Sequence, residues 1–594
     1  MCRIAGLINL SMPVPALEEL VKEMCRVQKH GGPDNEGIYV NKNHNLVLGH
    51  RRLSLIDLSD AGNQPMVYDN GRYVISYNGE LYNYAILKEQ LKKIGCFFNT
   101  ATDTEVILAA FSIWGVAAFQ KFNGMFAFAL WDNVTGNIYL VRDGAVIKPL
   151  YFAHTKEGLA FASEVRAFKH IPYLKTEHPH WNVYLMAYGH LPEPITTLKE
   201  VQPLKKGYYL QYNILSGALI QEEFVRFSYL ECINDREQAI CQIKDSLTAA
   251  VKRQLISDAP IGVFLSGGLD SSIIAHLANQ HHPNLNTISL FFDDHNYSEK
   301  KYQDLVQKDI KSVQYQHLLK EETFHNDFSN IIKSMDLPSC DGINTWFISK
   351  YAKEQGLKAV LSGLGADELY GGYPSFDRIK SALLAQKIPD FLLRSGKLSA
   401  SKKIRRLCYL SIDGPIGMYL FLRGQFIPGE VAKYLDAEEA EVWRILEQQP
   451  HLPAITHLTA KNQAAWIETN LYMQNQLLRD ADVMSMAHGV EIRVPFLDTD
   501  FLELSLKISS KTKYEGEFKK QLLIDCFKDV LPEQIWNRPK MGFSFPFKQW
   551  LLKDQYAGNQ SAIQSAAYHE KFVGGKLHWS QFFTVFLMEN YLKT

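Results

Sequence analysis

Two kinds of hydrophobic pattern divide the chain. From Cys2 to about Ser163, apolar residues tend to alternate with polar ones in short runs, as in YVISYNGE (73–80) and MFAFALWD (125–132), with turn residues between the runs. Alternation of this kind is typical of strands that bury one face. We therefore expect antiparallel sheet with a few helices in this part of the chain.

The pattern changes at about Arg236 to helical spacing and short continuous apolar runs. Ile240, Ile243, Leu247 and Val251 lie three or four residues apart, which predicts a helix with one apolar face. The continuous runs are IGVFL (261–265), TISLFF (287–292) and KAVL (358–361). Runs like these are typical of buried parallel strands, so we expect an α/β domain here.

A segment rich in proline and lysine, HLPEPITTLKEVQPLKKG, separates the two patterns. It predicts a first domain at 2–195, a junction at 196–235 and a second domain at 236–594. A chain of 594 residues is too long for a single core, which agrees with this division.

Charge and composition exclude several classes of protein. The 63 Lys and Arg residues nearly balance the 64 Asp and Glu residues without a basic stripe, so a nucleic-acid partner is not expected. No stretch approaches the roughly 18 continuous apolar residues of a membrane span, and the N-terminus lacks the order of a signal peptide. We expect a cytoplasmic protein whose eight scattered cysteines are reduced and, without a CxxC pair, bind no zinc.

The segment IGVFLSGGLDSSIIAHLA predicts a phosphate-binding turn between a strand and a helix. Ser266, Gly267 and Gly268 occupy this turn, where backbone N–H groups and the helix N-terminus favour an anion such as a polyphosphate. The turn lacks the lysine of a P-loop. Asp270 could help to hold Mg²⁺, which takes one or two carboxylates together with phosphate oxygens. The alternative is an ordinary glycine turn.

A second loop, KAVLSGLGADELYGGY, also leaves a buried strand through glycines and then presents Asp367 and Glu368. Ligands of doubly wound sheets lie beyond the carboxyl ends of the strands, so the two loops are expected to face one nucleotide. Asp367 is then a second candidate carboxylate for the metal ion. Its alternative role is to cap the following helix.

These loops belong to a larger set of motifs, the others being Cys2, YNGELYN (77–83), TDTE (102–105), MSMAHGVEIRVPFLD (484–498) and NRPKMGFSFP (537–546). In type and order, along nearly the whole chain, the set resembles the glutamine-hydrolysing asparagine synthetase family. The resemblance implies an α+β Ntn-hydrolase sandwich with glutaminase activity, followed by an α/β parallel-sheet ATP-pyrophosphatase domain and joined to it by an ammonia tunnel. It further implies an enzyme that forms AMP and pyrophosphate while it amidates a carboxylate, and a homodimer.

In the first domain the resemblance implies glutamine hydrolysis. With Met1 removed, Cys2 would be the nucleophile, and its own α-amino group, with an ordinary pKa of about 7.7 to 8.0, would accept the thiol proton. Asn78 and Gly79 would form the oxyanion hole, because the tetrahedral intermediate needs fixed donors. The alternative for Cys2 is a buried structural cysteine. The residues implied to bind glutamine are Arg52 at the α-carboxylate, Asn78, and Glu80 and Asp103 at the amino end.

In the second domain the resemblance implies binding of ATP and Mg²⁺. Asp270 and Asp367 would hold the metal ion, and Lys520 would lie near the α-phosphate, where charge grows as pyrophosphate leaves. Arg493 and Glu368 are expected at the acceptor. The alternatives are a solvated helix residue for Lys520 and a structural ion pair for Arg493. The ATP-binding positions are Leu265, Ser266, Gly267, Gly268, Asp270, Ser271, Leu290, Ser362 and Gly363.

Four positions depart from the family pattern. Gly31 and Gly144 stand where many members have arginine, and Val146 stands where they have glycine. Valine does not readily adopt a positive φ, so if the loop needs a left-handed residue there, its path is expected to differ. Leu364 stands where typical members often have an acidic residue, which could remove a proton from the attacking ammonia or orient the acceptor.

Three hypotheses remain from the sequence. The first is an asparagine synthetase that activates the β-carboxylate of aspartate as an acyl-adenylate and traps it with ammonia. The second is a related amidotransferase for another carboxylate, such as a sugar acid or a peptide side chain, which Leu364 and the altered loops favour. The third is a binding protein without catalysis, which Cys2 and both phosphate loops argue against because binding needs no nucleophile.

Overall fold

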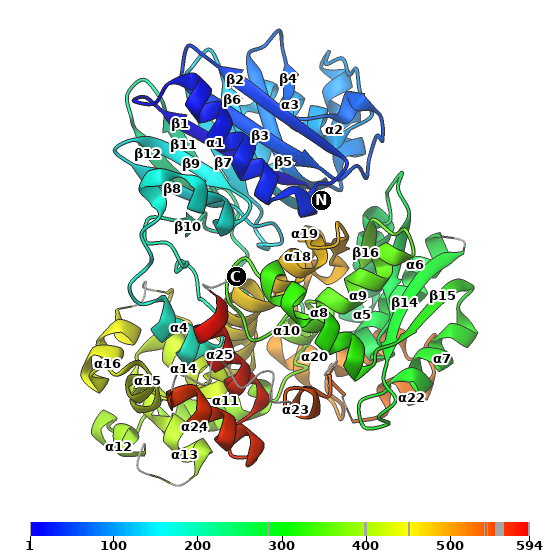
Figure 1. Cartoon of the computed structure of the whole chain (residues 1–594). Helices are drawn as coiled ribbons and strands as arrows, with labels where there is room; N and C mark the ends of the chain where they lie inside the picture. The colour runs from blue at the N-terminus through cyan, green and yellow to red at the C-terminus, as the bar shows by residue number, and fades with distance from the viewer. Residues whose placement is uncertain are drawn as a thin grey trace.

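The computed structural model describes residues 2–282, 284–396, 399, 401–448, 452–539, 541–542, 545–552 and 563–591. These residues form two antiparallel sheets and one parallel sheet. Figure 1 shows the antiparallel sheets together in the blue-to-cyan part of the chain, above a larger part that runs from green to red. None of the described helices combines the length and the hydrophobicity that a membrane crossing requires.

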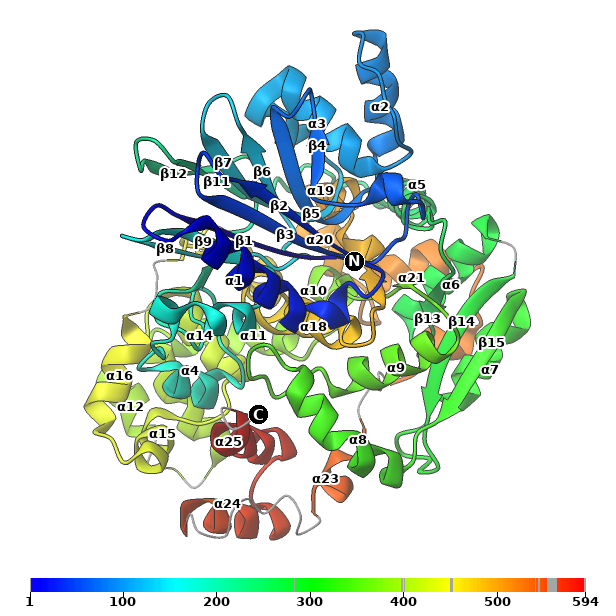
Figure 2. The same cartoon turned by 45° about the horizontal axis from the view of Figure 1, so that its top comes forward.

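The first domain is a sandwich of two six-stranded sheets with helices on the outside. Side chains from both sheets, among them Leu48, Trp131 and Leu140, form one buried cluster, as expected for two sheets packed face to face. Helix α1 (Val14–Val27) covers one sheet, as Figure 2 shows, while α2 (Tyr84–Lys93) and α3 (Asp103–Trp114) lie beside the other. One sheet has the order β10 (Gln202–Pro203), β8 (Tyr151–Thr155), β9 (Gly158–Ala162), β1 (Arg3–Asn9), β3 (Leu46–Arg52), β2 (Asn35–Asn41). The other has the order β12 (Leu219–Glu223), β11 (Tyr208–Asn213), β7 (Asn137–Arg142), β6 (Gly124–Asp132), β5 (Tyr73–Leu81), β4 (Met66–Tyr68).

The predicted junction at 196–235 requires correction. Strands β10, β11 and β12 fall within it and complete the edges of the two sheets. Leu210 and Tyr212 on β11 are buried between the sheets, because YYLQYN has the alternation of a half-buried strand. In the opposite direction, α4 (Trp181–Tyr188) lies within the predicted first domain but packs among helices of the second part. The chain therefore contributes α4 to the second part before strands β10, β11 and β12 complete the sheets of the first domain.

The second domain is built on a parallel sheet with the order β15, β14, β13, β16, β17. The predicted apolar runs form its three central strands, which confirms the expected α/β class. Helix α5 buries Ile243, Leu247 and Val251, as their spacing predicts. The elements are α5 (Arg236–Gln254), β13 (Ile261–Phe264), α6 (Leu269–His281), β14 (Leu285–Phe291), α7 (Lys300–Asp309), β15 (Ser312–Leu318), α8 (Glu321–Ser334), α9 (Ile343–Glu354), β16 (Ala359–Leu361) and β17 (Glu491–Arg493).

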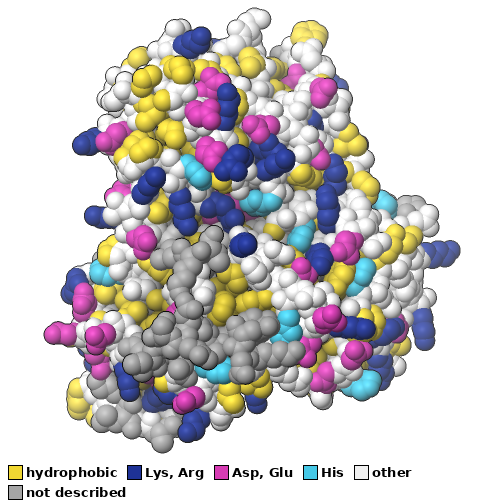
Figure 3. Space-filling view, in the orientation of Figure 1, with side chains coloured by type: hydrophobic (Ala, Val, Ile, Leu, Met, Phe, Trp, Pro, Cys, Tyr) yellow, Lys and Arg dark blue, Asp and Glu magenta, His cyan; other side chains and the backbone are white. Residues whose placement is uncertain are grey.

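Helices complete the second part. They are α10 (Ala366–Tyr370), α11 (Ser375–Ala385), α12 (Asp390–Ser395), α13 (Lys402–Arg405), α14 (Gly414–Arg423), α15 (Pro428–Leu435), α16 (Glu439–Glu447), α17 (Ala460–Ile467), α18 (Arg479–Met486), α19 (Thr499–Lys507), α20 (Ser510–Tyr514), α21 (Gln521–Phe527), α22 (Glu533–Trp536), α23 (Phe547–Trp550), α24 (Ile563–Val573) and α25 (Trp579–Asn590). Figure 3 shows basic and acidic side chains intermixed over one face of the molecule, in keeping with the near-zero net charge.

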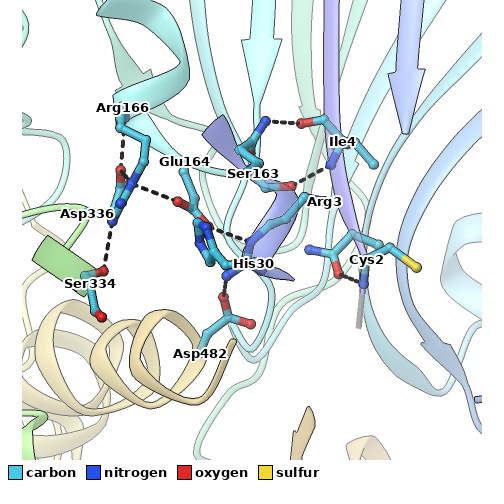
Figure 4. A network of polar contacts seen from close by, with 12 residues as sticks. Cys2, Arg3, Ile4, His30, Ser163, Glu164, Arg166, Ser334, Asp336 and Asp482 are labelled. Atoms are coloured by element: carbon cyan, nitrogen blue, oxygen red, sulfur yellow. Dashed lines mark hydrogen bonds and ion pairs between the residues drawn. The ribbon is translucent and has the colours of Figure 1, made fainter. Parts of the chain in front are cut away.

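Buried ion pairs join the two parts beside the first strand, as Figure 4 shows. Arg3 is fully buried, and its guanidinium contacts Glu164 at 2.6 Å in its own domain and Asp482 of α18 at 2.9 Å. His30 contacts Glu164 at 2.9 Å. A Cβ at Gly31 would lie 2.7 Å from Arg3 Cγ, so the Arg3 side chain fills the space beside this glycine.

The loop after β7 keeps a left-handed residue although that residue is valine. Val146 has φ 61° and is buried, so this loop holds a left-handed residue here even though valine does not readily adopt that conformation. The carboxylate of Asp143 accepts hydrogen bonds of 3.0 Å from the backbone N–H groups of Ala145, Ile147 and Lys148. These bonds hold the loop and offset the cost of a β-branched residue at positive φ.

Candidate active sites

The nucleophile predicted from the sequence lies at the entrance to β1. Cys2 is buried, and its backbone N–H donates to Asn78 Oδ1 at 3.2 Å. The thiol donates to the carbonyl oxygen of Leu53 at 3.9 Å. Burial raises the pKa of the Cys2 thiol, while the nearby Arg52 lowers it by a smaller amount. A thiol in this setting needs a neighbouring base before it can attack.

Asn78 and Gly79 are consecutive residues near the end of β5, and the Asn78 side chain contacts Cys2, which directly precedes β1. Asn78 Nδ2 is buried and has no hydrogen-bond partner among the described residues, so it is a donor available to a ligand. A Cβ at Gly79 would lie 2.2 Å from the Met125 carbonyl oxygen, which excludes every other residue type. Asn78 is thus brought to Cys2 with an unused donor, and Gly79 follows it on the same strand.

The three predicted glutamine-binding side chains other than Asn78 lie near the same end of β5. Asp103 begins α3 and accepts hydrogen bonds from the Tyr77 hydroxyl at 3.0 Å and the Leu81 N–H at 2.9 Å. Burial raises the pKa of Asp103 to about 6 and that of Glu80 well above its usual range. Arg52 is also buried, so all three charged groups depend on partners for their stability.

The Arg52 guanidinium already has partners in the loop that follows β3. It donates to the carbonyl oxygen of Ser59 at 2.7 Å and to Asn63 Oδ1 at 2.9 Å, and it also contacts the Asp57 carbonyl oxygen. A Cβ at Gly62 would lie 2.1 Å from Arg52 Nη2, so the loop fits closely around it. Arg52 therefore shapes this loop, and a bound carboxylate would share its guanidinium.

The first phosphate loop runs from β13 into α6 as predicted. Ser266 Oγ lies 2.9 Å from Ser271 Oγ and accepts the Gly268 N–H at 3.2 Å, which closes the turn. Gly267 has φ 84°, and a Cβ on it would lie 2.9 Å from the Gln303 nitrogen. A glycine is therefore required at this position by both backbone conformation and space.

The loops after β13 and β16 meet because these strands are neighbours in the sheet. Asp270 from the first loop and Asp367 from the second both contact the ammonium group of Lys520, with Lys520 Nζ 2.5 Å from Asp270 Oδ2. Burial alone would lower the pKa of Lys520, but the two carboxylates outweigh it and raise the pKa above its ordinary value. A Cβ at Gly372 would lie 1.7 Å from Asp367 Oδ1.

These residues line a cavity of about 1030 Å³. Its wall includes the predicted residues Ser266, Gly268, Asp270, Ser271, Ser362, Gly363, Asp367, Glu368 and Lys520. Two adjacent carboxylates match the preference of Mg²⁺ for a few protein oxygens completed by phosphate and water, so the donor set fits this ion. The described residues contain no group of three or more His, Cys, Asp or Glu side chains suited to hold a metal without such help.

Comparison with known proteins agrees with this arrangement. Residues 242–573, more than half of the chain, match the family model of asparagine synthase, and residues 1–224 match that of a glutamine amidotransferase domain. The chain belongs to the asparagine synthase family. Membership of this family gives the fold class and the reaction class of the chain. The protein is an ATP-dependent ligase that takes nitrogen from glutamine.

Individual relatives of this asparagine synthase family member have different names. Glutamine-hydrolyzing asparagine synthetase 1 of Bacillus subtilis is 30% identical over 591 residues, covering 95% of this chain and 90% of that protein. Glutamine-hydrolyzing asparagine synthetase 3 of the same organism is 25% identical and covers 91% and 86%. Amidase chry2 of Gibberella zeae is 26% identical and covers 88% and 84%. Family membership therefore leaves the acceptor open.

Four predicted residues of this family member do not line the cavity. Gly267, Leu265 and Leu290 are not part of its wall, and the side chains of the two leucines are buried. Arg493 on β17 is fully buried; it contacts Glu491 at 2.6 Å and reaches Glu80 of the first domain at 3.5 Å. Its guanidinium also donates to two backbone carbonyls. We therefore correct the assignment of Arg493: it is a structural link between the domains and not an acceptor ligand.

The structure adds one residue, Arg538, whose place in the site the motifs did not identify. Arg538 lines the cavity, donates to the Gly267 carbonyl oxygen at 2.9 Å and contacts Glu299 at 2.7 Å. Its guanidinium also lies 3.6 Å from the centre of the Tyr302 ring. Arg538 belongs to the NRPKMGFSFP motif, but its partners come from distant parts of the sequence, so the motif alone could not reveal its position.

Proposed function

We propose that the protein uses ATP to activate a carboxylate as an acyl-adenylate and converts it to an amide with ammonia released from glutamine. The products are AMP, pyrophosphate, glutamate and the amide. The meeting of Asp270, Asp367 and Lys520 in one cavity with the SGGLDS turn carries this proposal, because two carboxylates suited to Mg²⁺ and a lysine ammonium lie together beside a turn that favours phosphate. The arrangement of Cys2 and Asn78 supplies the second half of the reaction.

In the first domain, removal of Met1 would turn the Cys2 nitrogen into an α-amino group. That amine accepts the thiol proton, and the thiolate attacks the glutamine amide. The amide C–N bond breaks, ammonia leaves with the proton that the amine returns, and water then hydrolyses the resulting thioester to glutamate. Asn78 Nδ2, which lacks a partner among the described residues, donates to the oxyanion together with the Gly79 N–H. Asp103 and Glu80 hold the glutamine amino group, and Arg52 holds its carboxylate.

In the second domain, the SGGLDS turn holds the phosphates and Lys520 stabilises the charge that develops as pyrophosphate leaves. Mg²⁺, held by Asp270 and Asp367, would supply further neutralisation of the phosphates. The acceptor carboxylate attacks the α-phosphate, and ammonia then attacks the resulting adenylate. That last attack requires a group that takes a proton from the nitrogen.

We assign this proton acceptor to Glu368, because Leu364 has no ionisable group. Both side chains line the cavity. Glu368 is 1% exposed, and the Tyr373 hydroxyl donates to its Oε1 at 2.7 Å, which fixes its orientation. A positioned carboxylate beside the adenylate can replace the acid that typical members have at the Leu364 position.

Glu368→Gln is expected to lower amide formation about 10²-fold or more, because general-base catalysis of this kind contributes that much. Adenylate formation, measured as acceptor-dependent exchange of pyrophosphate into ATP, should persist. Glu517→Gln is the matched control, since Glu517 is an exposed carboxylate of the same cavity wall. Amide formation at the wild-type rate in Glu368→Gln would refute the role.

Leu364→Ala is expected to reduce the rate of amide formation less than about tenfold, because Leu364 shapes the cavity without moving a proton. The amide formed per AMP released should remain near the wild-type ratio, with the acceptor saturating. A complete loss of amide with continued release of AMP would show that Leu364 shields the adenylate from water.

Aspartate is the first candidate acceptor, since it would make the protein a glutamine-hydrolysing asparagine synthase. The second candidate is another carboxylate, which Leu364 favours because this chain lacks the usual acidic group near the acceptor. An acceptor screen with glutamine, ATP and Mg²⁺, followed by release of pyrophosphate, distinguishes the two. If none of the tested carboxylates causes release of pyrophosphate, the proposed reaction is contradicted.

A further inference from the structure

A second cavity, of about 1240 Å³, lies next to the active-site cavity in the helical part of the second domain. Residues from α11, α14, α15 and α25 contribute to its wall. The two cavities share six lining residues: Tyr373, Pro374, Arg423, Gln425, His578 and Ser580. The two cavities therefore adjoin at this shared wall.

The shared wall lies on the acceptor side of the active site. Tyr373 donates to Glu368, which faces the proposed adenylate. Arg423 is held between the rings of Tyr472 and Tyr373, at 3.5 and 4.6 Å from their centres. Neither the SGGLDS turn nor Lys520 lines the second cavity. The second cavity therefore adjoins the part of the active-site cavity near Glu368 and not the part formed by the SGGLDS turn.

The described lining of the second cavity is strongly basic. It contains seven Lys and Arg side chains but only two acidic ones. Both acids already have partners: Glu468 contacts Arg423 at 2.7 Å, and Glu430 contacts Arg405 at 2.7 Å. The remaining cations other than Lys576 leave an excess of positive charge over the two acids of the described lining, around a concave surface that focuses the field toward an anion.

The positive charge of the lining is partly buried at Arg406, whose side chain is half-buried. Burial is the main cause that lowers the pKa of its guanidinium below the ordinary value. One of its nitrogens donates to the Leu420 carbonyl oxygen at 3.3 Å, and no described carboxylate forms an ion pair with it. A half-buried guanidinium without a counterion is costly, and an anionic ligand would offset that cost.

We propose that the acceptor is larger than aspartate and carries at least one further anionic group, which the second cavity binds. The reactive carboxylate lies beside Glu368 and Leu364, and the rest of the acceptor crosses the wall at Tyr373 and Arg423 to the basic surface. The inference rests on the proposed amide synthetase reaction. The volume supports it, since ligand sites of about 300 to 1,000 Å³ already enclose molecules much larger than an amino acid. Sugar acids in short oligomers and acidic peptides share this chemistry.

The test uses the complete enzyme with glutamine, ATP and Mg²⁺ and measures release of pyrophosphate. Aspartate, trigalacturonate and tetraglutamate serve as acceptors at equal concentrations. One of the two polyanions is expected to give kcat/KM at least tenfold above that of aspartate, and its identity distinguishes a sugar acid from a peptide. If aspartate is used as well as both polyanions or better, the inference fails while the reaction class stands. If no acceptor releases pyrophosphate, the inference and the proposed reaction both fail.

Substitutions at the rim of the second cavity provide an independent readout. Arg378 and Lys433 are exposed lining residues, so Arg378→Gln and Lys433→Gln should fold normally. Each is expected to raise KM for the preferred polyanion about tenfold while kcat changes less than twofold. Lys387→Gln, at an exposed lysine outside the cavity, is the matched control. An unchanged KM in both rim variants would overturn the inference.

Discussion

Cys2→Ala is expected to abolish product formation from glutamine while product formation from added ammonium salts continues. The substitution removes the only atom proposed to attack the glutamine amide, whereas the ATP cavity of the second domain keeps every lining residue. Loss of a covalent nucleophile typically reduces the rate by several orders of magnitude, so the residual glutaminase activity should be near background.

The measurement is amide formed with glutamine and, separately, with ammonium chloride, under the same ATP and acceptor concentrations. Cys96→Ala is the matched control, because Cys96 is a half-buried cysteine on the same domain outside the site. A folded Cys2→Ala protein that has lost both activities would show that Cys2 does more than release ammonia.

Asp270→Asn and Asp367→Asn are each expected to lower adenylate formation about 10²-fold or more, which corresponds to about 3 kcal/mol of lost transition-state stabilisation. Each substitution keeps the size of the side chain but removes one of the two negative charges that meet at Lys520. Hydrolysis of glutamine by the first domain should persist, since neither residue contacts that site.

Exchange of labelled pyrophosphate into ATP, with and without the acceptor, measures this step directly. Asp377→Asn is a suitable control, because Asp377 is an exposed acid that contacts Lys519, next to Lys520 in the sequence. ATP turnover near the wild-type level in both Asp270→Asn and Asp367→Asn would remove these residues from the phosphate site.

The sequence predicted the elements whose signals are local. Continuous apolar runs identified β13, β14 and β16 because these central strands are buried on both faces. The edge strands were not predicted: β15, SVQYQHL, is partly exposed and polar, and β17 has three residues. The boundary of the first domain was misplaced because short edge strands such as β10 have almost no pattern of their own.

In the candidate sites, too, the residues with local sequence signals were predicted and those that depend on distant contacts were not. The SGGLDS turn and the second loop were predicted because glycine positions and nearby carboxylates lie within one short segment. Arg493 was misassigned because its environment depends on Glu80, more than 400 positions earlier in the chain. Val146 shows a third case, in which hydrogen bonds to Asp143 maintain a backbone conformation that the residue type disfavours. The roles of the individual residues in catalysis stay predictions.

The contact between Arg3 and Asp482 limits how this protein can exchange domains with its relatives. A chimera that joins the first domain of this chain to a second domain without an acid at the Asp482 position would bury Arg3 with Glu164 as its remaining close partner. Breaking one side of a buried ion pair commonly costs about 3 to 5 kcal/mol, a large share of the stability of a domain. The residue that follows the nucleophile would then be the weakest point of the hybrid. Recombination between members of this family is therefore expected to succeed only when both halves of this contact are inherited together.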